Sequence, residues 1–335
     1  MSYGLVRRLL FSLPPESAHT FTLKAINYWH RVGFSLGNAN RFVKPVKCMG
    51  LEFSNPIGLA AGLDKNGDYL DALASLGFGF IEIGTVTPQP QPGNDSPRLF
   101  RIPQAQAIIN RMGFNNKGVD HLVTQVQRAK YQGVLGINVG KNFSTPIEQA
   151  VDDYLICLRK VYSLASYITI NISSPNTKNL RQLQSGEELG IFLQKLKQEQ
   201  VRLDNQYHRY VPLVVKIAPD LSADDITEMA DLFIRHEIDG VIATNTTISR
   251  EQVENYPNGN QAGGLSGSPL TKKSTAVVST LHQVLGDKIP IIASGGVMNG
   301  DDVKEKYQAG ASLVQLYTGL IYAGPRLVSE AVQAV

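Results

Sequence analysis

Cysteine is scarce in this sequence. The 335 residues include only Cys48 and Cys157, which lie far apart and form no Cys-x-x-Cys pair or ferredoxin-like run. Disulfide frameworks, zinc sites and iron–sulfur clusters all need more cysteines at closer spacing. We therefore expect no metal centre, and we expect the protein to work in a reducing compartment.

Long apolar runs are missing as well. No stretch approaches the roughly 18 apolar residues of a membrane span. The segment Leu9-Leu10-Phe11 is too short for the apolar region of a secretory signal and soon reaches Pro14-Pro15. The composition, 43% hydrophobic and 18% charged, is that of an ordinary soluble globular protein. The length suits one large α/β barrel or two modest domains.

Net charge is low but unevenly distributed. The whole chain carries +3, whereas residues 1–47 hold seven lysines and arginines against Glu16 alone, a net of +6. The remaining residues, 48–335, therefore sum to −3. A basic N-terminal segment indicates an anionic partner, either a lipid surface or a nucleic acid.

The same segment contains two amphipathic patterns, one on each side of Pro14-Pro15. Each pattern predicts a short helix with one apolar face. The two helices either pack on the main domain as a hairpin or dock on a membrane surface, and the pattern favours neither. The apolar positions are Leu5, Val6, Leu9, Leu10 and Leu13 in the first helix, and Ala18, Phe21, Thr22, Ala25, Trp29 and Val32 in the second.

After residue 50, short apolar stretches alternate with segments of helical periodicity. Eight such units, with strands that are apolar throughout, predict an α/β fold with a closed (β/α)8 TIM barrel. We expect a small two-helix extension over residues 1–40 and the barrel over residues 41–335. Longer loops around 87–111 and 248–267 would project from one end of it. The predicted strands are 57–61, 80–86, 133–139, 167–172, 213–217, 240–244, 289–293 and 312–317. The predicted helices are 68–76, 118–129, 146–161, 186–201, 224–235, 272–284 and 301–308.

Polar residues follow these strands with a regularity that indicates a site. In a barrel of this kind the active site lies at the carboxyl ends of the strands. The run 171–177 (NISSPNT) ends the fourth strand and contains one candidate proton-transfer group, Ser174. A turn that caps the next helix explains this run alone equally well. Four amides, which suit a cyclic imide or ureide ligand, are those of Asn110, Asn171, Asn176 and Asn245.

Glycine-rich turns and two lysines add to this site. Turns at Gly295-Gly296 and Gly319 follow the seventh and eighth strands, where barrels bind phosphate through backbone N–H groups. They favour a phosphorylated cofactor. Lys65 and Lys216 lie at strand ends, where an unpaired buried ammonium is costly. Either lysine stabilises an anionic reduced flavin, or it forms an ion pair, for example with Asp64 or Glu82.

Seven ordered motifs carry a resemblance that spans the chain. They are 58–65 (GLAAGLDK), 110–115 (NRMGFN), 171–177 (NISSPNT), 215–220 (VKIAPD), 244–247 (TNTT), 263–267 (GGLSG) and 294–296 (SGG). In these motifs the sequence resembles dihydroorotate dehydrogenases of the second, membrane-associated class. The resemblance implies oxidation of (S)-dihydroorotate to orotate, a step of de novo UMP synthesis, with FMN reduced and then reoxidised by a membrane quinone.

The resemblance also implies roles for individual residues. Ser174 is the catalytic base, which takes a proton from C5 of the substrate, and Thr177 helps to relay it. Soluble relatives have the more acidic cysteine at this position. The implied FMN contacts are Ala60, Ala61, Gly62, Leu63, Asp64, Lys65, Thr85, Asn138, Asn171, Lys216, Thr244, Gly267, Gly295, Gly296, Tyr317 and Thr318. The implied substrate contacts are Lys65, Asn110, Arg111, Met112, Gly113, Phe114, Asn171, Asn176, Asn245 and Thr246. The implied quinone contacts are His19, Arg101 and Tyr317.

The implied partners are the substrate, a membrane quinone and an anionic membrane surface, with no nucleic acid and no obligate protein partner. The protein would lie on the cytoplasmic side of the cell membrane as a peripheral protein. Two alternatives stay open. Another FMN barrel, such as a tRNA dihydrouridine synthase, would need a basic RNA-facing module, and the negative charge of residues 48–335 opposes it. A non-enzymatic protein that docks on membranes would carry the barrel as an inert scaffold.

Overall fold

The computed structural model describes residues 3–34, 43–177, 179–184 and 186–335, which fold around a closed barrel of eight parallel strands. Each barrel strand pairs with the next one along the chain, and the last pairs with the first through Val314 opposite Ile57. All eight strands were predicted, so the (β/α)8 barrel is confirmed. They are β3 (Ile57–Leu59), β4 (Phe80–Val86), β7 (Val134–Val139), β8 (Tyr167–Asn171), β9 (Leu213–Ile217), β10 (Gly240–Ala243), β12 (Ile291–Ser294) and β13 (Leu313–Leu316).

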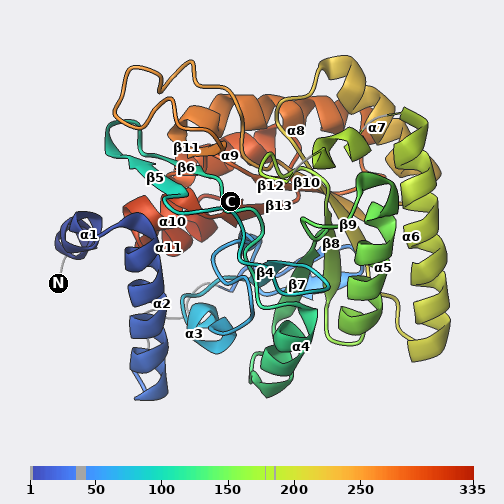
Figure 1. Ribbon diagram of the computed structural model, residues 1–335, viewed down its shortest axis with the longest axis horizontal. Coiled ribbons are helices and arrows are strands. Elements are labelled where there is room, and N and C mark those ends of the chain that lie inside the picture. The colour runs from blue at the N-terminus through green and yellow to red at the C-terminus, as the bar shows by residue number, and fades with distance from the viewer. Residues whose placement is uncertain (1–2, 35–42, 178, 185) are drawn as a thin grey trace.

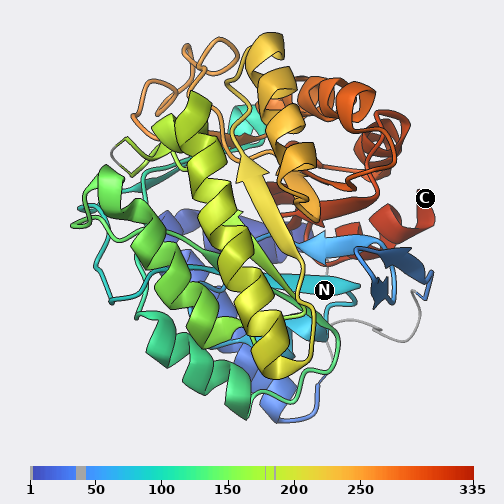
Figure 2. The same cartoon turned by 90° about the vertical axis from the view of Figure 1, so that its right-hand side faces the viewer.

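Helices cover the outside of the barrel (Figure 2). Local sequence signals begin two of them: Ser222 and Asp225 form a capping box at one N-terminus, and Asn299 and Asp302 form one at another. All seven predicted helices are present, and two short helices that were not predicted follow the last strand. The helices are α3 (Leu70–Ala74), α4 (Val119–Arg128), α5 (Ala150–Val161), α6 (Gly186–Tyr207), α7 (Ala223–Arg235), α8 (Thr271–Leu285), α9 (Gly300–Gln308), α10 (Thr318–Ala323) and α11 (Arg326–Gln333).

A small β-hairpin closes the amino-terminal end of the barrel. It consists of β1 (Val46–Cys48) and β2 (Leu51–Phe53). Phe53 is fully buried and meets Phe80 edge to face, and Phe80 in turn meets Tyr167. Aromatic and branched side chains of the described residues fill the barrel interior at this end, so we look for a ligand site at the opposite end.

The two long loops expected at one end of the barrel contain strands. The first excursion forms the hairpin of β5 (Leu99–Ile102) and β6 (Ala107–Asn110), and the second adds β11 (Gly264–Gly267) on the other side of β6. The expectation of loops was wrong at these positions, because three strands of four residues each gave no periodic signal of their own. Figure 1 shows this sheet next to α10.

The N-terminal helices stand at one side of the barrel (Figure 1). They are α1 (Tyr3–Ser12) and α2 (Pro15–Arg31), with α1 against α10 and α2 against α3 and β5. In α2 only Ala18 and Leu23 are buried, and in α1 no residue is. Much of the predicted apolar surface is therefore exposed, at Leu5, Leu9, Leu13, Phe21, Trp29 and Val32, and Tyr28 and Phe34 are exposed as well. No helix in the described part of the chain has the length and apolar character to cross a membrane.

The start of β4 depends on a close backbone approach at Gly79. A Cβ atom there would lie 1.8 Å from the carbonyl oxygen of Asn55. We expect Gly79→Ala to lower the free energy of unfolding by about 2 kcal/mol or more, because backbone must move to relieve the clash. The matched control is Gly190→Ala in α6, where the new methyl group meets only ordinary contacts and helix propensity improves. Chemical denaturation compares the two, and equal stabilities would contradict this prediction.

Candidate active site

A cavity opens at the carboxyl ends of the barrel strands and leaves about 1250 Å³ free of protein atoms, part of it open to solvent. Its wall combines strand ends with the three-stranded sheet and one edge of α2. It brings together most of the predicted site residues, which are Ala60, Ala61, Gly62, Lys65, Thr85, Asn110, Met112, Gly113, Phe114, Asn171, Ser174, Asn176, Lys216, Thr244, Asn245, Thr246, Gly267, Gly295, Gly296, Tyr317 and Thr318, together with His19.

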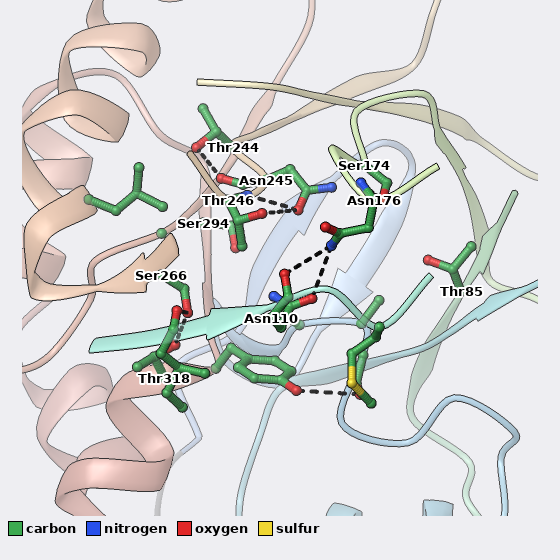
Figure 3. A pocket seen from close by; sticks show the side chains of 18 of the residues that line it. Thr85, Asn110, Ser174, Asn176, Thr244, Asn245, Thr246, Ser266, Ser294 and Thr318 are labelled. Carbon is green, nitrogen blue, oxygen red and sulfur yellow. Dashed lines mark hydrogen bonds between the residues drawn. The ribbon is translucent and has the colours of Figure 1, made fainter. Parts of the chain in front are cut away.

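The four predicted amides line the cavity as two hydrogen-bonded pairs, which we call the amide cluster. Asn176 Nδ2 donates to Oδ1 of Asn110 at 3.2 Å and to its main-chain oxygen at 3.1 Å, as Figure 3 shows. Asn245 Nδ2 donates to Ser173 Oγ at 3.0 Å and to Asn171 Oδ1 at 3.4 Å. The amides hold one another in place, so they present donors and acceptors to a ligand in a fixed pattern.

Ser174 lies beside this cluster in the turn after β8. Its side chain lines the cavity and is 5% exposed. Its Oγ accepts a hydrogen bond from the main-chain N–H of Asn176 at 3.2 Å. Among the described residues, no acceptor receives the hydroxyl hydrogen of Ser174. The hydroxyl is thus oriented from one side and free to exchange a proton with a ligand on the other.

A buried carboxylate organises the floor of the cavity. Glu82, on β4, is fully buried and accepts hydrogen bonds from Asn138 at 2.8 Å, from Tyr167 at 3.0 Å and from Gln315 at 2.7 Å. The Oδ1 atom of Asn138 then accepts from Thr85 at 2.5 Å and from Asn171 at 3.2 Å. Since the carboxylate only accepts, it fixes which atom each amide turns toward the cavity.

Two lysines reach this cavity without a hydrogen-bond partner among the described residues. The alternative of ion pairs with Asp64 or Glu82 is not observed there, because main-chain N–H groups occupy the Asp64 carboxylate and three neutral donors occupy that of Glu82. Burial lowers the pKa of Lys65 to about 8, and burial also lowers the pKa of Lys216. Unpaired ammonium groups at a cavity wall fit an anionic ligand.

The glycine turn after β12 packs closely against the start of α8. Gly295 and Gly296 have φ values of 110° and 71°, and a Cβ at Gly296 would lie 2.3 Å from the main chain of Thr271. Hydroxyl groups of α8 bind this turn, from Thr271 to the Gly296 carbonyl at 2.6 Å and from Ser274 to the Gly295 carbonyl at 2.8 Å. These contacts fix the turn, and its two glycines present main chain to the cavity. Such a turn suits a phosphate group.

A buried lysine braces this turn from behind. Lys306, on α9, is fully buried and donates to the Thr271 carbonyl at 3.0 Å and to Ser274 Oγ at 2.5 Å. Burial lowers its pKa to about 8. Among the described residues no carboxylate lies within salt-bridge distance of Lys306, so this cation adds positive potential behind the glycine turn.

One atom on the cavity floor lacks a partner. The Oε1 atom of Gln315, which is 1% exposed, accepts no hydrogen bond within the described part of the chain, although Nε2 of the same amide binds Glu82. Gln315 and Lys216 both line the cavity. An orphaned acceptor, two unpaired cations and a glycine cradle together fit a flavin with a phosphate tail.

Comparison with known proteins agrees with this geometry. The family model described as dihydroorotate dehydrogenase matches residues 44–335. The chain is 60% identical to the dihydroorotate dehydrogenase (quinone) of Acinetobacter baylyi over all 335 residues and the whole of that protein. It is 59% identical to that of Nitrosomonas eutropha over 330 residues, which cover 98% of this chain and 96% of that one. The chain belongs to the dihydroorotate dehydrogenase family.

Solved structures of the family share the fold. The dihydroorotate dehydrogenase of Eimeria tenella in complex with ferulenol superposes with a TM-score of 0.88 at 35% identity, covering 97% of this chain and 93% of that one. The ligand-free form from the same organism gives 0.87 at 37% identity. This flavin-dependent family is an enzyme family, so the dihydrouridine synthase and inert-scaffold alternatives are no longer needed.

Six residues with an implied role lie outside the cavity wall. Leu63 packs in the core, Asn138 lies behind Thr85, and Thr177 is buried beyond Ser174. The Asp64 carboxylate is turned away from the cavity because it accepts from the N–H groups of residues 66, 68 and 69. The remaining two are Arg111, which donates to Gln261 and Pro97, and Arg101, which donates to the carbonyls of Phe11 and Leu13.

Several lining residues were not predicted. Gln315 lies on β13 two positions before the predicted Tyr317, so the two-residue period of a strand was the signal that could have found it. Ser266 lies within the GGLSG motif and accepts from Thr318 Oγ1 at 2.9 Å. The others come from elements that no motif marked, and they are Glu16, Leu99, Ile108, Leu270 and Val297.

The edge of the cavity nearest α2 contains His19 and Tyr317. Burial, together with the nearby Lys65 charge, lowers the pKa of His19 to about 4, so the imidazole is neutral at pH 7. Burial raises the pKa of Tyr317 to about 12, and its hydroxyl donates to the Gly62 carbonyl at 3.4 Å. Glu16 completes this edge and is held by Arg98 at 2.6 Å. Neutral donors here suit an uncharged polar ligand group.

We expect the Lys216 ammonium to destabilise the ligand-free protein. Burial lowers its pKa, so the ammonium is more stable in the unfolded chain, and the cost is largest below the folded-state pKa. We expect Lys216→Met to raise the thermal midpoint of the ligand-free protein at pH 7 by roughly 2 °C while weakening flavin retention. As control, Lys288→Met replaces an exposed lysine and should change neither quantity. A lower thermal midpoint in Lys216→Met than in the unmodified protein would contradict the conclusion that the Lys216 ammonium is unpaired.

Proposed function

We propose that this protein oxidises (S)-dihydroorotate to orotate, with FMN as hydride acceptor and a membrane quinone as final electron acceptor, in de novo UMP synthesis. The observation that carries the proposal is the buried Ser174 hydroxyl beside a cluster of four amides, in a cavity that also holds two unpaired lysines. The names of the relatives support it.

The amide cluster binds the pyrimidine ring. A ureide has two N–H groups and two carbonyls, and Asn110, Asn171, Asn176 and Asn245 offer matching acceptors and donors. Lys65 pairs with the substrate carboxylate, which raises the lysine pKa back toward its usual range and keeps the ammonium charged. Arg111 and Phe114 contribute through the main chain of the 110–114 segment, since the Arg111 guanidinium is bound elsewhere.

Ser174 acts as the base. When bound, FMN supplies an acceptor for the hydride that leaves C6 of the substrate. Ser174 Oγ takes the proton from C5, and its own hydrogen passes on through Thr177. Serine is a weak base, so the reaction needs the hydroxyl held at the reacting carbon with bulk water excluded.

Several groups of this chain hold the cofactor. The Gly295-Gly296 turn, Gly267 and Thr318 bind the phosphate through backbone N–H groups. Lys216 and the amides of Asn171 and Gln315, which line the same cavity, would hold the isoalloxazine, and the lysine charge would favour its reduced form.

The N-terminal segment connects the site to the membrane. The division into residues 1–40 and 41–335 separates a segment of net positive charge from the barrel, and residues 35–42 lie outside those described. The exposed apolar surface of α1 and α2 inserts into the cytoplasmic face of the cell membrane, with the basic residues on anionic lipid. The quinone enters between the helices toward His19 and Tyr317, while Arg101 holds the end of α1.

Replacing Ser174 tests the base directly. We expect Ser174→Ala to slow flavin reduction by dihydroorotate at neutral pH at least about 100-fold, the size of a lost general base, with FMN still bound. Anaerobic stopped-flow absorbance measures the rate, and the flavin content of the purified variant checks binding. The control is Ser163→Ala, at an exposed turn. An unchanged rate in the Ser174 variant would rule out this serine as the base.

Polar substitutions on the exposed helix face test membrane contact. Leu9 is 71% exposed and Phe21 is 59% exposed. We expect the Leu9→Ser, Phe21→Ser double variant to bind anionic lipid vesicles at least about tenfold more weakly, because two apolar side chains no longer leave water. Reoxidation by a long-chain quinone should slow while flavin reduction stays normal. Phe143→Ser, at a 64% exposed barrel position, is the matched control and should retain vesicle binding.

A further inference from the structure

An arginine behind the Ser174 turn joins two sides of the cavity. Arg181 lies in the 3₁₀ turn Leu180–Gln184. Its Nε donates to the Ser173 carbonyl at 3.1 Å, and its Nη2 donates to the Thr246 carbonyl at 2.9 Å. The first carbonyl belongs to the turn after β8 and the second to the turn after β10. One guanidinium therefore crosslinks the turn that carries the base to the turn that carries part of the amide cluster.

Asp220 holds this guanidinium in place. Its Oδ2 accepts from Arg181 Nη1 at 3.0 Å and from the Ile248 N–H at 3.0 Å, and its Oδ1 accepts from Lys273 Nζ at 2.6 Å and from the Thr247 hydroxyl. Burial alone would raise the pKa of Asp220, but hydrogen bonds from Lys273, Thr247 and the main chain lower it below its usual range. The carboxylate is thus a fixed anion after β9, between the two turns that Arg181 joins.

The contact to Ser173 controls Ser174 through the backbone. The carbonyl of Ser173 belongs to the peptide plane that also contains the nitrogen of Ser174. Holding that oxygen fixes the direction in which Ser174 leaves the turn, and so fixes its Oγ. Neither Arg181 nor Asp220 lines the cavity, so neither touches a ligand there.

We propose that Arg181, anchored by Asp220, is a positioning residue that sets the Ser174 hydroxyl at its working distance from the bound substrate. The inference rests on the proposed function. A planar group with donors in three directions is needed, because the acceptors lie on three separate segments, and the single ammonium of lysine cannot reproduce that fork. A displacement of about 1 Å at a reacting group costs roughly 100-fold in rate.

The first test compares chemistry with binding. In Arg181→Ala we expect flavin reduction at saturating dihydroorotate to slow roughly 100-fold, while the dissociation constant of orotate, measured by its effect on the flavin spectrum, changes less than about threefold. Arg181→Lys keeps the charge and should also be slow, and it serves if the alanine variant does not fold. Arg202→Ala, which breaks a pair with Glu199 on the outside of α6, is the matched control and should react normally. A normal rate in a folded Arg181 variant overturns the proposal.

A double-mutant cycle separates positioning from general damage. If Arg181 acts through the Ser174 hydroxyl, the same substitution at 181 should cause almost no further loss in a Ser174→Ala background, because no hydroxyl remains to be positioned. An equal loss in both backgrounds overturns the proposal in favour of a purely structural role. Adding guanidinium ion to Arg181→Ala should restore part of the rate in the Ser174 background only. Failure of the unmodified protein to reduce its flavin with dihydroorotate would instead refute the proposed function.

Discussion

The buried carboxylate of Glu82 is the interaction on which the rest of the site depends. It joins β4 to β7, β8 and β13 through three neutral donors and has no cation within salt-bridge distance among the described residues. A buried anion must keep all its donors, since losing one leaves charge unsolvated. This requirement fixes the amides of Asn138 and Gln315, and through Asn138 the positions of Thr85 and Asn171. The Glu82 carboxylate therefore determines which donors and acceptors the cavity floor presents to a ligand.

Around that floor, several polar groups lower the stability of the ligand-free protein because they are placed to bind a ligand. Within the described part of the chain, Lys216 is buried and Lys65 is half-buried, neither has a hydrogen-bond partner, and the Gln315 Oε1 atom accepts no hydrogen bond, so the ligand-free cavity is less stable than a filled one. Binding a cofactor with a phosphate and a polar ring edge satisfies these groups at once. The Ser174 turn is treated differently, because hydrogen bonds from Arg181, Asn176 and Asn245 fix it before any ligand binds.

Sequence patterns predicted the barrel strands well because each is a short, mainly apolar run bounded by turns. They also predicted which strand ends carry the site, since parallel strands bring their carboxyl ends together. They did not predict the sheet of β5, β6 and β11, whose strands are too short to show a period, nor the hairpin of β1 and β2. Side-chain direction was also beyond them: Asp64 and Arg111 lie in site motifs but bind elsewhere. Arg181 and Asp220 are 39 positions apart in the sequence, and no sequence pattern indicated that they would pair.

The account makes one central claim, that the strand-end cavity holds FMN against a pyrimidine substrate. Anaerobic addition of (S)-dihydroorotate to the purified, unmodified protein tests it most directly, with the visible flavin absorbance followed before and after a quinone is added. The account predicts that dihydroorotate bleaches the flavin band, that one equivalent of orotate forms per flavin, and that the quinone restores the band. A flavin band that dihydroorotate leaves unchanged would contradict the account.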